Sequence, residues 1–579
     1  MKELRGLSAA PGVAVGKAFL YLDDEAPEIP RYGIRTPDVE NEWDRFQNAV
    51  RIAESEVVEL RDRASREMGD EHAKIFEAHL LMLSDVELRD QIRARLVELE
   101  QNIEWILWDL TRELSQKLAA AGDPYLRERS IDIHDISRRV LNHLLLIKKV
   151  SLADLDQDVI LVTHNLLPSD ALVMNKEHVK GIVMDIGGKT SHTAILARAF
   201  EIPAVLGLTD ATMEIREGSL VVVDGGAGKV IVEPNGAVLD RYRRLTETLR
   251  KASSALLAEK DLPAMTMDGK RLTLKANIEI PEEADHALAY GAEGIGLYRS
   301  EFLFLTPGRT ADEEEQYDSY RRVVVSMAGW PVTIRTLDVG GDKLIPDIQG
   351  AEEKNPLLGW RAIRFCLARR ELFGTQLRAL LRASVDGDLR IMFPMISGLE
   401  ELEDALSALE DAKVECRERG QAFREDLKVG IMIEVPSAAM TADILARRSD
   451  FFSIGTNDLV QYSIATDRGN ERVAYLAQPF HPAVLRFVKA TIDAAHAKGI
   501  SAAMCGELAG DPNASAVLLG LGLDEFSMSA VSIPLVKRVI RGVNSAECEA
   551  LARDALAQNS YRDVETLVRT WMAERFPTA

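Results

Sequence analysis

Residues 187–198, which read GGKTSHTAILAR, place a histidine where phosphoryl chemistry is feasible. A short apolar run at 181–185 precedes them and an alanine-rich segment follows, so the pattern predicts a strand, a glycine turn and a helix. His192 would lie near the helix start, where unpaired backbone N–H groups and the helix dipole favour an anion. A histidine that carries a phosphoryl group fits this position, and so does one that only caps the helix.

Four arginines form a second group of candidate residues. Arg299 and Arg335 lie where predicted strands give way to loops, and Arg361 in GWRAIR and Arg468 in TDRGN add positive charge. A single surface arginine is usually just solvated, but several gathered together repel one another unless an anion offsets the repulsion. Guanidinium groups suit phosphate and carboxylate oxygens, so these residues indicate a site for a small anionic ligand.

Two carboxylates and a thiol complete the candidate chemistry. Glu434 in IMIEVP and Asp458 in GTNDL lie at the ends of adjacent predicted strands, and Asn457 precedes Asp458. Few hard oxygen ligands beside a phosphate site are typical of Mg²⁺ that substrate and water help to hold, although salt bridges to the arginines are the alternative. Cys505 in MCGEL is expected at the end of the last strand, either as a buried structural residue or as an acid or nucleophile.

The strands that must position these residues belong to a repeating strand and helix pattern, which begins near residue 262. The clear candidate strands are 272–276, 294–298, 332–337, 390–394, 429–435, 451–455 and 501–505, with a less clear one near 358–361. Eight such units over about 310 residues predict a (β/α)8 TIM-type barrel. The C-terminal ends of its strands converge on one mouth, which would make neighbours of residues far apart in the sequence.

The preceding part of the chain predicts a smaller α/β domain that is interrupted by helices. Its short β-type runs are 6–22, 159–162, 181–184, 204–206 and 220–223, and residues 224–228 close a hairpin into 230–232. Thr36 is expected to cap a long helix with an apolar seam in steps of four and three, and further helical patterns occupy 71–96, 101–121 and 129–146. These helices predict an inserted antiparallel bundle without catalytic residues.

These patterns predict an α/β multidomain protein. The expected domains are an α/β domain at 1–34 and 147–236, an inserted helical bundle at 35–146, a helical linker at 237–261 and the barrel at 262–579. A length of 579 residues is ample for several domains of this size.

Composition narrows the classes of function and the cellular location. The net charge of −22 argues against nucleic-acid binding, and it favours a basic protein partner or simply solubility. No apolar run approaches the roughly 18–20 residues of a membrane-spanning helix, and the N-terminus does not resemble a signal peptide. The 4 cysteines lack paired spacing, so we expect a cytoplasmic protein without disulfides.

A series of motifs follows in one order along the chain: GLSAAPGVAVGKAF, IFEAHLLML, GGKTSHTAILARAFEIPAVLG, LYRSEFLF, RTLDVGGDK, NPLLGWRAIR, FPMI, IEVPSAA, GTNDLVQY, DRGN, HPAVL and MCGELAG. Through these motifs, and along essentially its full length, the chain resembles enzyme I of the bacterial phosphoenolpyruvate-dependent sugar phosphotransferase system. So many motifs in one order make the resemblance specific. It implies a swivelling phosphohistidine domain with an inserted helical domain, followed by the barrel.

The resemblance also implies residue roles. His192 corresponds to the histidine that is phosphorylated on Nε2, Cys505 to the acid that protonates the enolate carbon, and Glu434 and Asp458 to the Mg²⁺ ligands. Residues expected to contact phosphoenolpyruvate are Arg299, Arg335, Lys343, Arg361, Asn457, Asp458 and Arg468.

The activity implied by the resemblance is phosphorylation of His192 from phosphoenolpyruvate with release of pyruvate. The phosphoryl group then passes to a histidine of the small carrier HPr, as the first step of sugar uptake. In the family the helical insertion docks HPr, the barrel forms a homodimer and the histidine domain moves between the two. His134 in SIDIHDISRRV departs from the family pattern at a position that bears on docking.

Three alternatives differ from this expectation. A pyruvate phosphate dikinase or phosphoenolpyruvate synthase needs a large ATP-binding domain upstream. Here only about 110 residues, without a phosphate-binding glycine loop, separate the first strand region from the histidine domain. A non-catalytic scaffold would have lost catalytic groups, and all are present. The nitrogen-branch paralogue normally carries an N-terminal sensory domain, whereas this chain begins at GLSAAPG, which favours the sugar branch.

Overall fold

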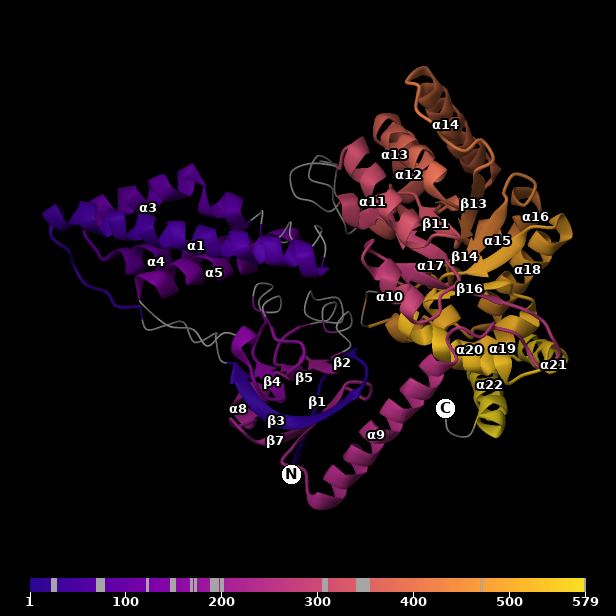
Figure 1. The fold of residues 1–579 in the computed structure, drawn as a ribbon, viewed down its shortest axis with the longest axis horizontal. Coiled ribbons are helices and arrows are strands. Elements are labelled where there is room, and N and C mark those ends of the chain that lie inside the picture. The colour runs from indigo at the N-terminus through magenta and orange to yellow at the C-terminus, as the bar shows by residue number, and fades with distance from the viewer. Residues whose placement is uncertain are drawn as a thin grey trace. The chain divides into compact units, whose positions relative to one another are not determined.

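The fold is described from a computed structural model (Figure 1). The described residues are 1–21, 29–68, 76, 79–120, 124–145, 152–166, 170, 174–187, 197, 202–304, 311–339, 355–468, 470 and 472–576. His192 and Lys343 lie outside these ranges, as does the side chain of His134, so their expected roles stay predictions. The chain divides into two compact units, Met1–Ser253 and Ser254–Ala579.

The first unit contains a mixed sheet with the strand order β1-β8-β7-β3-β4-β5-β6-β2. Its strands are β1 (Lys2–Arg5), β2 (Leu7–Ala10), β3 (Val13–Tyr21), β4 (Val159–Thr163), β5 (Val179–Met184), β6 (Ala204–Leu206), β7 (Leu220–Asp224) and β8 (Lys229–Val232), with a short helix, α8 (Ala211–Glu214). Because β3 and β4 are parallel neighbours, with Lys17 opposite Val159, the helices between them in the sequence form an insertion, as predicted.

Apolar side chains alternate between the two faces of this sheet. Leu161 and Ile182 belong to one core cluster, and Ile160 and Val183 belong to another. The predicted hairpin is confirmed, since β7 and β8 pair in antiparallel fashion. The predicted strand before the His192 segment is β5, and Gly187 follows it with a φ of 122° that suits a glycine turn.

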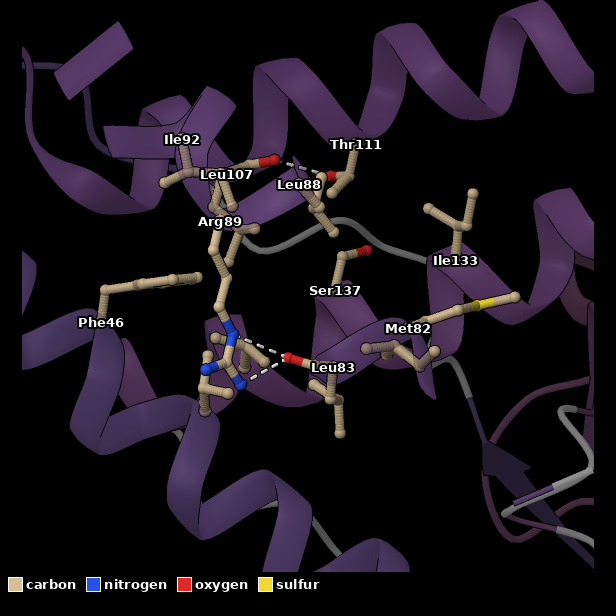
Figure 2. A pocket seen from close by; sticks show the side chains of 13 residues that line it. Phe46, Met82, Leu83, Leu88, Arg89, Ile92, Leu107, Thr111, Ile133 and Ser137 are labelled. Atoms are coloured by element: carbon tan, nitrogen blue, oxygen red, sulfur yellow. Dashed lines mark hydrogen bonds between the residues drawn. The ribbon is translucent and has the colours of Figure 1, made fainter. Parts of the chain in front are cut away.

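The inserted helices are α1 (Val39–Met68), α3 (Val86–Leu99), α4 (Ile103–Ala120) and α5 (Pro124–Leu144). The predicted seam of α1 is buried from Val39 to Leu60, and it forms the bundle core with Ile92, Leu96 and Leu107. An apolar cavity of about 40 Å³ lies among these helices (Figure 2). Arg89 lines the cavity, and its guanidinium donates two hydrogen bonds to the Leu83 carbonyl.

Two helix predictions in this region are wrong in detail. The continuous helix expected at 71–96 is interrupted, because the Asp85 carboxylate accepts hydrogen bonds from the Glu87 and Leu88 amides and starts α3 as a new helix. Thr36 does not cap α1 with its side chain. A 3-10 turn at Thr36–Asp38 precedes the helix, and the Thr36 hydroxyl donates to Glu100 at 2.7 Å.

The second unit begins inside the helix α9 (Gly236–Ala258), which confirms the helical character of the predicted linker. Its strands form a closed parallel barrel: β9 (Thr273–Ile278), β10 (Ile295–Arg299), β11 (Val332–Arg335), β12 (Leu389–Phe393), β13 (Lys428–Ile433), β14 (Phe451–Ile454), β15 (Ser501–Met504) and β16 (Glu525–Met528). The TIM-type barrel predicted from the sequence is therefore confirmed (Figure 1).

Helices follow the barrel strands and cover the barrel from outside. They are α10 (Glu283–Ala289), α11 (Glu313–Ser326), α12 (Ala362–Ala368), α13 (Arg370–Ala383), α14 (Leu399–Glu418), α15 (Pro436–Met440), α16 (Ala442–Leu445), α17 (Thr456–Ile464), α18 (Pro482–Lys498), α19 (Pro512–Leu521), α20 (Ile533–Arg541), α21 (Ser545–Leu556) and α22 (Tyr561–Arg575). All four cysteines are buried and free, in agreement with the absence of paired spacing. Every helix in the described ranges is too short or too polar to traverse a lipid bilayer.

The strand expected near residues 358–361 is wrong. A 3-10 helix at Pro356–Leu358 occupies this place, with proline at its first position, where a missing backbone N–H is tolerated. The eighth strand is instead β16, which pairs with β15 and β9 and closes the barrel. Cys505 therefore follows the seventh strand of the barrel and not the last.

Candidate active site

The C-terminal ends of the barrel strands bring the candidate residues to one mouth. Arg299 ends β10 and Arg335 ends β11. Glu434 directly follows β13, and Cys505 directly follows β15. Asn457 and Asp458 lie in the first turn of α17, which follows β14. The arrangement agrees with the convergence expected for parallel strands in a barrel.

Two arginines at this mouth are held by buried carboxylates. Arg335 pairs with Glu301 at 2.8 Å and with Asp338 at 2.9 Å, and Asp338 also pairs with Arg361 at 2.9 Å. Burial alone would lower the pKa of both guanidinium groups, but the neighbouring carboxylates raise the pKa of each above its ordinary value. Both arginines therefore stay charged although their side chains are only 11% exposed.

Each of these arginines keeps a donor that no group in the described residues accepts. The Nε atoms of Arg335 and Arg361 are buried, and neither has a hydrogen-bond partner in the part of the chain that the structure describes. A buried N–H without an acceptor is costly, so both donors are suited to the oxygens of an anionic ligand.

Glu434 and Asp458 lie in different electrostatic settings. Glu434 is 2% exposed, and its Oε1 accepts a hydrogen bond from the Met395 amide at 2.7 Å. Burial, followed by the charges of Asp458 and Asp338, raises the pKa of Glu434 to about 8. The Glu434 carboxyl therefore holds a proton at neutral pH unless a cation is present.

Asp458 forms the salt bridges that were the alternative to metal binding. It pairs with Arg468 at 3.1 Å and with Arg361 at 3.5 Å. Within the described residues, no cluster of three or more His, Cys, Asp or Glu side chains could hold a metal ion. A cation held by Glu434 and Asp458 would need further ligands beyond these two carboxylates.

A glycine makes space for the Glu434 carboxylate. A Cβ atom at Gly455, which follows β14, would lie 2.9 Å from Glu434 Oε2. Any larger residue at this position would push the carboxylate aside, so the sequence GTND suits a site that uses Glu434.

Cys505 lies against an apolar cluster in the barrel. It is 4% exposed and packs with Leu297, Met392, Met432 and Phe451. Burial raises the pKa of the Cys505 thiol, Ser453 and Arg335 oppose this effect, and Glu434 adds to it once its carboxyl has ionised. The thiol is therefore protonated at neutral pH, which is the form that can donate a proton.

The remaining predicted residues are held by partners at the rim of the mouth. Arg299 pairs with Glu279 at 2.6 Å, and the Arg468 amide donates to Gln461 at 3.1 Å. The Asn457 side chain accepts from the Glu507 amide at 3.1 Å and donates to the Glu507 carboxylate at 3.3 Å.

Sequence analysis did not single out the residues that hold the arginines. Glu301, Asp338 and Tyr462 each contact Arg335 or Arg361, with Tyr462 accepting a hydrogen bond from Arg361 at 3.3 Å. The available signal was their place inside the motifs LYRSEFLF, RTLDVGGDK and GTNDLVQY, next to residues that had been selected.

Known proteins resemble this chain over its whole length. The phosphoenolpyruvate-protein phosphotransferase of Listeria innocua serovar 6a is 43% identical over 573 residues, which cover 99% of this chain and 100% of that protein. The protein of the same name from Haemophilus influenzae is 42% identical and covers 99% of both chains. The chain belongs to the phosphoenolpyruvate-protein phosphotransferase family.

Three family models match successive parts of the chain. A PEP-utilising enzyme N-terminal domain matches residues 5–129, a PEP-utilising enzyme mobile domain matches 155–228, and a PEP-utilising enzyme PEP-binding domain matches 253–545. A solution structure described as Enzyme I (nEIt) is 37% identical and covers 43% of this chain and 99% of its own, with a TM-score of 0.38. The protein is thus an enzyme, a transferase built around a TIM-type barrel.

Proposed function

We propose that this enzyme transfers the phosphoryl group of phosphoenolpyruvate to Nε2 of its own His192, with Mg²⁺ and with release of pyruvate. It then passes the group to a histidine of HPr, as the first step of sugar uptake. The observation that carries the proposal is the barrel mouth, where two charged, buried arginines lie with two carboxylates and a protonated thiol.

The arginines would bind and orient the donor. Phosphoryl transfer depends mainly on positioning and on neutralising negative charge that spreads over the phosphate oxygens. Arg335 and Arg361 offer Nε donors, and Glu301 and Asp338 fix the direction of both guanidinium groups. Because this support is already in place, the arginines lose little freedom when the anion binds.

Glu434 and Asp458 fit a Mg²⁺ ion at this mouth. Burial raises the pKa of Glu434 and the charge of Asp458 adds to this effect, so a divalent cation held by both carboxylates would favour the charged form of each. When bound, the ion supplies charge neutralisation at the donor phosphate. Asp458 would then share its charge between the ion and the two arginines that it already contacts.

Cys505 would protonate the product. Loss of the phosphoryl group leaves the enolate of pyruvate, whose methylene carbon takes up a proton. The buried thiol is protonated at neutral pH and lies at the same mouth, so it is suited to act as the acid.

The proposal includes a partner, an assembly and a location. We infer that the helical bundle docks HPr and that the barrel forms a homodimer, on the basis of the family resemblance. A basic carrier surface would be attracted by the net charge of −22. The cytoplasm is the proposed location because all four thiols are free and buried.

The test follows the phosphoryl group in two steps. Purified enzyme is incubated with ³²P-labelled phosphoenolpyruvate and Mg²⁺, separated from the donor, and mixed with purified HPr. We expect label on the enzyme in the first step and on HPr in the second. Label that stays on the enzyme would refute HPr as acceptor, and labelling from ATP instead of phosphoenolpyruvate would refute the donor.

A further inference from the structure

A buried serine lies on the same inner face of the barrel as Cys505. Phe451 and Cys505 belong to one core cluster, and Ser453 follows Phe451 by two residues, so all three side chains face the same side. The strands β14 and β15 are parallel, with Ser453 opposite Ala503, and the Cys505 amide extends the ladder by donating to the Ile454 carbonyl at 3.1 Å. Ser453 is therefore one layer below the thiol.

Two small residues flank this layer, and the Glu434 and Met432 side chains fill the room beside one of them, Gly455. Ala503 stands below Cys505 on β15, and Gly455 continues β14 above Ser453. Neither residue has a side chain beyond Cβ. The larger neighbour Met432, opposite Ser453 on β13, is apolar and offers no strong hydrogen bond.

The Ser453 hydroxyl has no other use in the described part of the chain. Ser453 is 1% exposed, and its Oγ completes no hydrogen bond with the described residues. A buried hydroxyl without a partner is unfavourable, so this one is suited to donate to an anionic group that forms beside it. The Cys505 thiol donates to the Ile454 carbonyl at 3.9 Å, and Ser453 is a polar side chain on the same face one layer below it, where it opposes the rise that burial causes in the pKa of Cys505.

We propose that Ser453 is a positioning residue for Cys505, whose hydroxyl donates a hydrogen bond to the sulfur once the thiol has given up its proton. This inference rests on the proposed function, in which Cys505 is the acid. In that step the S–H bond breaks, its electron pair stays on sulfur, and the enolate carbon forms the new C–H bond. The serine keeps its own proton, and water later returns a proton to the thiolate.

Charged groups around Cys505 also change the stability of its thiolate, and so determine how much a hydrogen-bond donor is needed. Arg335 on β11 and Arg299 on β10 favour the thiolate, and Glu434 after β13 disfavours it. Burial is the largest influence and also disfavours the thiolate. A neutral hydroxyl can stabilise the thiolate without adding a charge that would compete for the anionic substrate.

The test compares Ser453→Thr with Ser453→Val, two variants of equal shape that differ in the hydroxyl. The alkylation rate of Cys505 by iodoacetamide is measured from pH 6 to 10 by mass spectrometry of its peptide, with Cys505→Ala as background. We expect the valine variant to react about tenfold more slowly than the wild type across this pH range, because a hydrogen bond to a charged group carries about this magnitude. The threonine variant should follow the wild type.

Identical alkylation profiles for the two variants would overturn the inference. Circular dichroism checks their folding, and Ser453→Ala replaces the valine variant if that variant does not fold. The rate of pyruvate release distinguishes a failure of this inference from a failure of the proposed function. If Cys505→Ala releases pyruvate at the wild-type rate, the acid role itself fails. If Cys505→Ala is slow while the threonine and valine variants alkylate alike, only the role of Ser453 fails.

Discussion

Glu434 makes the stability of the barrel unit depend on pH. Its pKa rises from an ordinary value of 4.5 to about 8 in the folded protein. Between these values the folded protein keeps a proton that the unfolded chain releases, so the free energy of unfolding falls as pH rises. The slope is at most about 1.4 kcal/mol per pH unit, which amounts to about 5 kcal/mol over the whole window.

The substitution Glu434→Gln isolates this contribution. Its amide oxygen can still accept the hydrogen bond from the Met395 amide, but it does not titrate. Urea unfolding is measured at pH 5.5 and 7.5 without divalent cations. Between these two pH values the free energy of unfolding of the wild type should fall by about 3 kcal/mol more than that of the variant. The exposed Glu403 gives a matched control, and Glu403→Gln should keep the wild-type slope.

If the free energy of unfolding depends on pH with the same slope in the wild type and in Glu434→Gln, the reasoning is refuted, because the titrating group would then lie elsewhere. Mg²⁺ provides a second arm of the same experiment. If Glu434 binds the ion, saturating Mg²⁺ stabilises the charged carboxylate and flattens the wild-type profile. A wild-type profile that is indifferent to Mg²⁺ would remove Glu434 from the proposed metal site.

Three further substitutions probe separate parts of the protein. Asp338→Asn should destabilise the barrel unit by about 3 kcal/mol in urea unfolding and raise the KM for phosphoenolpyruvate, since Arg335 and Arg361 lose their shared carboxylate; unchanged values would contradict this role. Cys505→Ala should lower the rate of pyruvate release at least about tenfold, and a wild-type rate would exclude the acid role. Val140→Ile should stabilise the helical bundle by up to about 1 kcal/mol in thermal unfolding, because one more methylene fills part of the cavity in Figure 2; a lower Tm would mean that the cavity cannot accept it.

The barrel mouth could be predicted because its strands are short apolar runs with clear ends. Once Arg299, Arg335 and Glu434 are placed at strand ends, the barrel geometry alone brings them together. The seam of α1 was predictable for a similar reason, since its period is long and regular.

The missed features depend on contacts between distant residues. The strand β16 reads EFSM, and its polar residues interrupt the apolar pattern by which the other strands were predicted. These residues are accommodated inside the barrel because Glu525 pairs with Lys275 and Ser527 donates to Asn277. The pairing of Glu301 with Arg335 likewise requires two neighbouring strands to be in register. The break before α3 depends on one aspartate cap, which an apolar period does not reveal.

The account rests on His192 as the acceptor of the phosphoryl group, and the most direct measurement is labelling of the purified enzyme with ³²P-phosphoenolpyruvate and Mg²⁺. We predict an acid-labile, base-stable label in the wild type and in the control variant His178→Ala, whose histidine pairs with Asp158 on the surface of the same unit. His192→Ala should carry no label. Label that persists in His192→Ala would contradict the account.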